Sequence, residues 1–216
     1  MDSARSTEQQ MLQETARRFA QTELPAHATD IENNNAPPNL VLRKRFAEMG
    51  FMGINLPSAY GGAGLGHFEA VLILEELAKI SVAVAFPVFE ASFGPALAIA
   101  HFAPKALQQR ILPQVCSGEM VVAVSMSEPN AGTALTDLKT RGKLSGDKII
   151  LNGSKRWCSG AGHADAYVVY CRLSDDPGAK GIGAVLVEKG TQGFTFGAPE
   201  SHMGWRGIAS ADMFFD

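Results

Sequence analysis

The sequence predicts an α+β protein, with an all-α N-terminal domain over residues 1–118 and a middle β domain, a small barrel or sandwich, over residues 119–216. Apolar residues recur at helical spacing as far as Gly118. Beyond this glycine they gather in short runs rich in β-branched and aromatic residues, and turn residues separate the runs. No internal repeat or low-complexity linker interrupts this pattern.

Five helices are predicted in the first half. The first begins at Ser6, whose hydroxyl can form a capping box with Gln9, and Pro25 is expected to end it because proline cannot continue the helical hydrogen bonds. Gly50 is expected to end the second helix, and Pro104 to start the fifth. The remaining predicted segments are a loop over residues 33–38 and helices over residues 40–49, 68–78 and 82–100.

The helix predicted over residues 82–100 is nearly long and apolar enough to cross a membrane. It contains Pro87, Glu90 and Gly94, which a membrane-spanning helix disfavours. We therefore expect a buried internal helix.

Six strands are predicted in the second half. Turn chemistry separates them at residues 145–147 (Ser-Gly-Asp), 152–153 (Asn-Gly), 176–178 (Asp-Pro-Gly) and 189–190 (Lys-Gly). The strands are expected over residues 121–126, 138–144, 148–151, 166–172, 182–187 and 213–215. Because the chain ends directly after an apolar strand, we expect a middle domain truncated at its C-terminal end.

Charge and motif content argue against several functions. A net charge of −3 offers no basic surface to nucleic acid or an anionic membrane. The three cysteines form no C-x-x-C pair and no signal peptide is visible, so we expect a cytoplasmic protein. The glycine-rich residues 61–66 do not match G-x-G-x-x-G, and the five histidines show no metal-ligand spacing. We therefore expect no metal site.

Two segments have the composition of a cofactor site. Residues 124–133 (VSMSEPNAGT) leave a strand for a loop whose N–H groups and hydroxyls can face a phosphate or a heterocycle edge. Residues 152–159 (NGSKRWCS) place Trp157 near Ser159, so an indole face for stacking lies beside a hydroxyl. A core tryptophan with solvent-facing serines is the alternative that the residues alone leave open.

Both segments resemble motifs of the acyl-CoA dehydrogenases, the first T-E-P-x-A-G-S-D and the second N-G-x-K-x-W-x-T. The resemblance extends to residues 55–62, 112–119 and 203–207, so it covers essentially the whole chain. Ala134 stands where the family has an aspartate, which removes a carboxylate that would fix the loop. Cys158 stands where the family has an aliphatic residue.

The resemblance implies an FAD site. Met126 and Ser127 would contact the flavin pyrimidine edge, Trp157 would pack against the isoalloxazine, and the Ser159 hydroxyl would reach flavin N5. Thr133 would lie near the FAD pyrophosphate and also contact the acyl-CoA. The implied cofactor-binding residues are Val124, Ser125, Met126, Ser127, Gly132, Thr133, Trp157, Cys158 and Ser159.

The same resemblance implies the reaction of an FAD-dependent oxidoreductase of fatty acid metabolism. A carboxylate removes the α-proton of an acyl-CoA while hydride passes from the β-carbon to flavin N5, giving an α,β-enoyl-CoA. In the family this carboxylate comes from a C-terminal helical domain that is missing here, so no catalytic residue of this chain is matched to it. Glu90 is a lone acid in an apolar helix, and burial there would raise its pKa and make it a candidate general base. We expect it instead near the helix surface or paired with a cation, and do not assign it as catalytic. Electron-transfer flavoprotein is the implied electron acceptor, and a homo-oligomer, dimer or tetramer, is the implied assembly of the full-length protein.

Two alternatives to this enzyme stay open. One is a truncated, non-catalytic subunit that binds flavin or a CoA ester, or that acts as the partner of a full-length homologue. The other keeps the fold and changes the chemistry, because flavin-dependent monooxygenases and nitroalkane oxidases resemble the family through the same two motifs.

Overall fold

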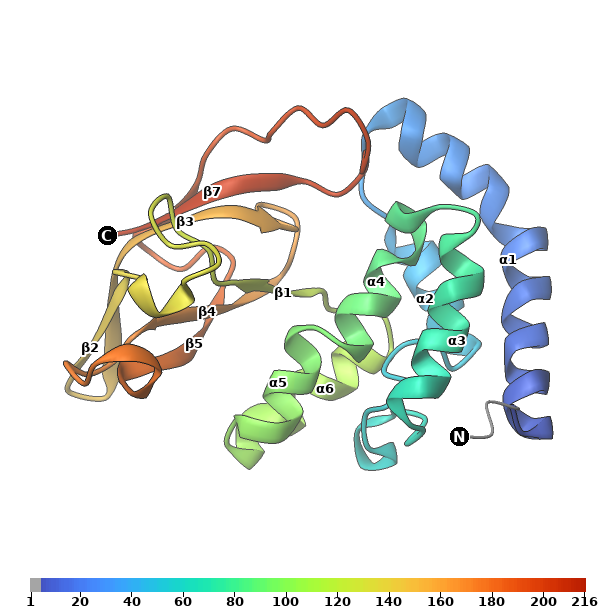
Figure 1. Cartoon of the computed structure of the whole chain (residues 1–216), viewed down its shortest axis with the longest axis horizontal. Coiled ribbons are helices and arrows are strands. Elements are labelled where there is room, and N and C mark those ends of the chain that lie inside the picture. Colours follow the sequence, from blue (N-terminus) through green and yellow to red (C-terminus); the bar gives the residue numbers. More distant parts are fainter. Residues whose placement is uncertain (1–4) are drawn as a thin grey trace. The chain divides into compact units, whose positions relative to one another are not determined.

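The computed structural model describes residues 5–216, which form a helical unit and a β unit (Figure 1). The helical unit comprises residues 5–121 together with Met203–Ile208, and the β unit comprises Val122–His202 and Ala209–Asp216. The predicted α+β class, helices first and strands second, is confirmed.

Residues 5–121 contain six α-helices. The predicted capping box is present at the start of the first, where Ser6 and Gln9 bond each other's backbone N–H groups. The run predicted as one helix over residues 82–100 is two helices, because Gly94 leaves the helical conformation and Pro95 begins a new first turn. The helices are α1 (Thr7–Asn34), α2 (Leu40–Glu48), α3 (His67–Ala78), α4 (Val82–Ser92), α5 (Pro95–Phe102) and α6 (Lys105–Cys116), with a short 3₁₀ turn at Ser58–Tyr60.

The prediction that Pro25 ends the first helix is wrong, since α1 continues through it to Asn34. Tertiary contacts stabilise the turns beyond the proline. Ile31 is buried, and the Arg206 Nε and Gly207 N–H groups donate to the Glu32 carbonyl and the Asn35 side chain at 3.0 and 2.9 Å. These contacts offset the helical hydrogen bond that proline cannot make.

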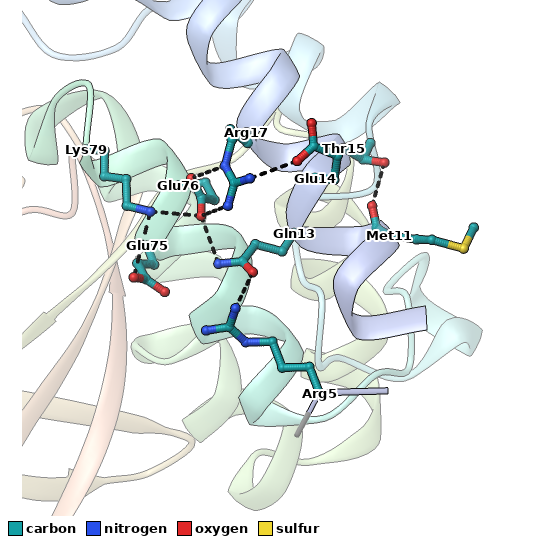
Figure 2. Close-up of polar contacts among 9 residues, drawn as sticks. All are labelled: Arg5, Met11, Gln13, Glu14, Thr15, Arg17, Glu75, Glu76 and Lys79. Carbon is teal, nitrogen blue, oxygen red and sulfur yellow. Dashed lines mark hydrogen bonds and ion pairs between the residues drawn. The ribbon is translucent and has the colours of Figure 1, made fainter. Parts of the chain in front are cut away.

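Glu76 of α3 is the buried polar centre of the helical unit, with 2% of its side chain exposed. Its carboxylate accepts hydrogen bonds from Gln13 and Arg17 of α1, at 2.8 and 3.2 Å, and from Lys79 at 2.8 Å (Figure 2). Burial raises the pKa of Glu76, but Arg17 and Lys79 outweigh burial and hold the pKa below its usual 4.5. The ionised carboxylate therefore joins α1 to α3.

The stretch Val82–Phe102 is apolar and long enough to cross a membrane by length and composition alone. Within the structure, 61% of an 18-residue apolar window of this stretch is buried by the rest of the protein. We interpret α4 and α5 as core helices of the helical unit, as the sequence predicts.

Seven strands form one curled sheet in the β unit, in the order β1-β4-β2-β3-β7-β6, with β5 paired to β4. Only the first pair, β1 with β4, and the single β2–β4 bridge are parallel. The strands are β1 (Val122–Ser125), β2 (Arg141–Ser145), β3 (Lys148–Ser159), β4 (Ala166–Arg172), β5 (Ile182–Glu188), β6 (Phe194–Phe196) and β7 (Ser210–Phe215), with 3₁₀ turns at Leu135–Asp137 and Gly178–Gly181.

Two details of the strand prediction are wrong. The three-residue β6 is too short to show an alternating pattern, so it was not predicted. The Asn152-Gly153 pair lies inside β3 and makes no turn. Gly153 has a φ of +141°, and a Cβ there would lie 2.7 Å from the Thr140 Cα, so this glycine is required by close backbone approach.

A prediction concerns the glycines that follow α2 and α6. Gly50 and Gly118 have φ of +72° and +73° in equivalent positions, but only Gly118 is crowded, since a Cβ there would lie 2.6 Å from the Arg43 carbonyl oxygen. Gly50→Ala should cost about 1 kcal/mol of unfolding free energy through the left-handed backbone alone. Gly118→Ala should cost roughly 1–3 kcal/mol more because the carbonyl must move. Urea unfolding of both variants measures the difference, and equal losses would contradict the assigned crowding.

Candidate functional site

The two segments singled out in the sequence lie side by side in the β unit. The Arg156 N–H of β3 donates to the Ser127 carbonyl, just beyond β1, at 2.8 Å. Two residues further along β3, the Cys158 Sγ lies 3.5 Å from the Val124 carbonyl oxygen of β1. The fold therefore brings together residues that lie about thirty positions apart in the sequence.

After β1 the chain makes a tight turn. Glu128 and Ala131 exchange both backbone hydrogen bonds, at 2.9 and 3.1 Å, with Pro129 and Asn130 at the tip. Proline suits the second position of such a turn because its φ is already set. Gly132 and Thr133 follow on the surface and are exposed, so their backbone and hydroxyl groups are accessible from solvent.

A buried ion pair holds this loop against the strand. Lys155 of β3 is completely buried, and its Nζ donates to the Met126 carbonyl at 2.9 Å and to Glu128 Oε1 at 2.8 Å. The Glu128 carboxylate also accepts the backbone N–H groups of Lys139 and Thr140, at 2.6 and 2.9 Å. Both ends of the loop over residues 126–140 are thus tied to one point in β3.

The charge on Glu128 depends on these partners. Burial raises the pKa of its carboxyl, but the hydrogen bonds from Lys155 and Thr140 outweigh burial and hold the pKa below its usual 4.5. The site residues predicted from the sequence did not include Glu128 or Lys155, although both stand inside the two motifs. The sequence signal that could have predicted this ion pair was a lysine inside a predicted strand and a glutamate in the loop of the other motif. Glu128 and Lys155 fix the loop after β1. Ala134, which stands where the family has an aspartate, lacks a carboxylate that would also fix this loop.

Trp157 lies at an irregularity of the sheet. Lys155 pairs with Met213 and Cys158 with Ala211, so β3 carries one more residue than β7 between these two pairs. Such a bulge turns a side chain away from the regular alternation. Trp157 takes a φ of +56°, rare for a bulky residue, and is 58% exposed. The alternative of a core tryptophan is therefore wrong.

The other predicted cofactor-binding residues divide by burial. Ser125 and Cys158 are 2% and 3% exposed, so their side chains are not accessible from solvent. Four other predicted residues, in or directly after β1 and at the end of β3, are half-buried and therefore partly accessible: Val124, Met126, Ser127 and Ser159.

Polar atoms beside Trp157 lack partners. The Arg156 guanidinium lies 5.0 Å from the Trp157 ring centroid, and its Nη1 is 3.9 Å from Oδ2 of Asp212 on β7. The Arg156 Nε and the Asp212 Oδ1 are buried and have no hydrogen bond. A buried polar atom without a partner is rare in proteins. An exposed indole, half-buried hydroxyls and unsatisfied polar atoms together fit a planar ligand with a polar edge.

The expectation for Glu90 is wrong. This carboxyl on α4 lies inside the helical unit, 8% exposed, without a hydrogen bond or ion pair to any other residue that the structure describes. Burial raises its pKa well above the usual 4.5 and favours the neutral form. Among residues 5–216, no group of three or more His, Cys, Asp or Glu is arranged to hold a metal ion.

Comparison with known proteins covers the whole chain. Residues 6–119 match the family model described as "Acyl-CoA dehydrogenase, N-terminal domain", and residues 123–216 match "Acyl-CoA dehydrogenase, middle domain". Mitochondrial isovaleryl-CoA dehydrogenase of Pongo abelii is 35% identical over 214 residues, which are 98% of this chain and 51% of the relative.

Solved structures agree with these matches. A structure described as an electron transferring flavoprotein of Acidaminococcus fermentans superposes with a TM-score of 0.91 at 32% identity, covering 100% of this chain and 57% of that one. The FAD complex of PigA gives a TM-score of 0.93 at 26% identity over the same shares. The chain thus spans about half the length of the proteins it matches.

Removing the cation of the buried pair should destabilise the β unit strongly. Lys155→Met leaves the Glu128 carboxylate buried and uncompensated, which should cost about 3–5 kcal/mol of unfolding free energy. Arg141→Met is the matched control, because its ion pair with Asp175 is exposed and should contribute about 0–1 kcal/mol. Denaturant unfolding of Lys155→Met, Glu128→Gln and the variant that carries both substitutions gives the coupling energy of the buried pair. Additive losses in that cycle would show that the two side chains do not act as a pair.

Stability should also fall in acid because of Glu128. Its folded pKa lies below the usual 4.5, so its contribution is complete above about pH 4.5 and is lost as the pH falls through the folded pKa. Unfolding free energy measured between pH 6 and pH 3 should drop less steeply in Glu128→Gln than in the parent chain. If the unfolding free energies of the two proteins fell equally with pH, Glu128 would not be the source of the acid sensitivity.

Proposed function

Because this chain belongs to the acyl-CoA dehydrogenase family, we propose that its β unit binds FAD, with Trp157, Met126–Ser127 and Ser159 as the residues that hold the flavin. The observation that carries the proposal is the exposed indole of Trp157, which a sheet bulge turns outward beside the half-buried Ser127 and Ser159. The likeness to the FAD complex of PigA supports it.

Each protein group has a defined task in this proposal. The indole offers a flat apolar face that excludes water from one side of a planar ligand. The hydroxyls of Ser127 and Ser159 can donate hydrogen bonds to the ligand edge, where a donor stabilises negative charge that develops during reduction. Lys155 and Glu128 contact no ligand in this scheme; they hold the Met126 carbonyl and the loop in place. The flavin, when bound, supplies the hydride acceptor.

For the whole protein we propose oxidation of an acyl-CoA thioester to its α,β-enoyl-CoA. The isovaleryl-CoA dehydrogenase relative supports a CoA thioester as the substrate class. An electron-transfer flavoprotein is the proposed acceptor of the electrons, because the resemblance to the acyl-CoA dehydrogenases implies it. Thr133, exposed beyond the turn after β1, is the residue of this unit that we assign to the acyl-CoA.

The two tryptophans of the chain, Trp157 and Trp205, allow a direct test of FAD binding. Trp205→Phe leaves Trp157 as the sole indole, and its fluorescence should be quenched as FAD is titrated in, because flavin stacks on it. Trp157→Phe leaves Trp205, whose ring packs against Phe86 of α4, and should show little quenching and weaker FAD retention. The opposite pattern, or no quenching in either variant, would rule out Trp157 as the flavin platform.

Substrate oxidation is tested separately from cofactor binding. If FAD-loaded protein is bleached anaerobically by an acyl-CoA, the thioester assignment stands. Bound FAD that stays oxidised with a series of acyl-CoA esters would limit the function of this chain to cofactor binding.

A further inference from the structure

At the bulge in β3, Arg156 and Trp157 together stand opposite a single residue of β7, Asp212. In a regular strand the side chains of neighbouring residues point to opposite faces of the sheet and do not meet. Here the Arg156 guanidinium lies over the Trp157 ring, 5.0 Å from its centroid. The bulge is therefore what brings a cation onto the indole of the next residue.

Arg156 is held close to the sheet. Its Nη1 lies 3.9 Å from Oδ2 of Asp212, and its backbone N–H donates to the Ser127 carbonyl at 2.8 Å. Its Nε is buried, although it has no hydrogen-bond acceptor among the described residues. A buried donor without an acceptor is unfavourable, so other contacts must keep the guanidinium in this position. The Asp212 carboxylate and the indole face supply them.

The orientation of the Trp157 indole depends on the same contact. Trp157 is 58% exposed, and exposed side chains change rotamer within picoseconds to nanoseconds. A guanidinium stacked on one face restricts that motion, because turning the ring would lose the cation–π attraction. Since the Arg156 Nε is buried, the covered face of the indole is the one turned toward the sheet. The opposite face is left open to solvent.

We propose that Arg156 is a positioning residue of the flavin site: its guanidinium covers the inner face of the Trp157 indole and leaves the outer face to the isoalloxazine. This inference rests on the proposed FAD site and goes beyond it, because Arg156 acts through Trp157 and needs no contact with the ligand. A guanidinium suits the task, since its planar group can stack on the ring while it pairs with Asp212.

The first test needs no cofactor. In the Trp205→Phe background, where Trp157 is the sole indole, time-resolved fluorescence anisotropy of FAD-free protein reports how freely the ring turns. Arg156→Met removes the charge and keeps an unbranched side chain, so a fast component should appear in the decay. Arg156→Lys should give an intermediate decay, because lysine keeps the charge but has no planar group to stack. Arg141→Met, the matched control, loses an arginine whose ion pair with Asp175 is exposed, and should behave like the parent.

The second test is the Kd for FAD, measured on the same variants by equilibrium dialysis. Arg156→Met should raise the Kd about two- to fivefold, the change that corresponds to the loss of one exposed cation–π contact. Arg156→Lys should raise it less, and Arg141→Met should leave it unchanged. Melting temperatures measured alongside check that each variant is folded at the temperature of the binding experiment.

Three results would contradict the role of Arg156. An anisotropy decay that is the same in Arg156→Met and the parent means that the guanidinium does not hold the ring. Tighter FAD binding by Arg156→Met means that the guanidinium occupies the face that the flavin needs. Equal changes in Arg141→Met mean that the loss of any arginine is the cause. If the parent binds no FAD, the proposed function fails, and the FAD-free anisotropy by itself still decides whether Arg156 holds Trp157.

Discussion

The geometry of the candidate site depends on one buried interaction, the pair formed by Lys155 and Glu128. Lys155 is the only lysine in the described chain that is completely buried, and its ammonium group bridges the Met126 carbonyl and the Glu128 carboxylate. A charge in this position is tolerated because each partner satisfies the other, and because two further backbone N–H groups complete the carboxylate. The loop after β1 consequently has a defined position against β3.

The same strand positions the tryptophan. Immediately after Lys155, the bulge against β7 gives β3 one extra residue, and Trp157 takes a left-handed backbone conformation. Regular pairing on both sides of the bulge holds this strained residue in place. β3 therefore has two tasks within a few residues: Lys155 fixes the loop from the interior, while Trp157 faces outward beside it.

In the helical unit, burial of carboxyl groups leads to two different results. Glu76 is surrounded by Gln13, Arg17 and Lys79 and joins two helices as an ion. Glu90 has no such partners in the described chain, so burial favours its neutral form. Sequence alone does not separate these cases, because both residues lie in apolar helices and their partners come from elsewhere in the chain.

Local sequence patterns were sufficient to predict the class of the protein, the order of helices and strands, and the two segments of the candidate site. Periodicity and turn residues are local signals, which is why the capping box at Ser6, the glycine after α2 and the extent of β4 were predicted correctly. Features that depend on partners far away in the sequence could not be predicted from these local patterns. Four features each require contacts with residues far away in the sequence: the passage of α1 through Pro25, the continuation of β3 through Gly153, the pairing of Lys155 with Glu128 and the outward turn of Trp157. The free energy of those contacts overrides local preference, and it is not encoded in any window of neighbouring residues.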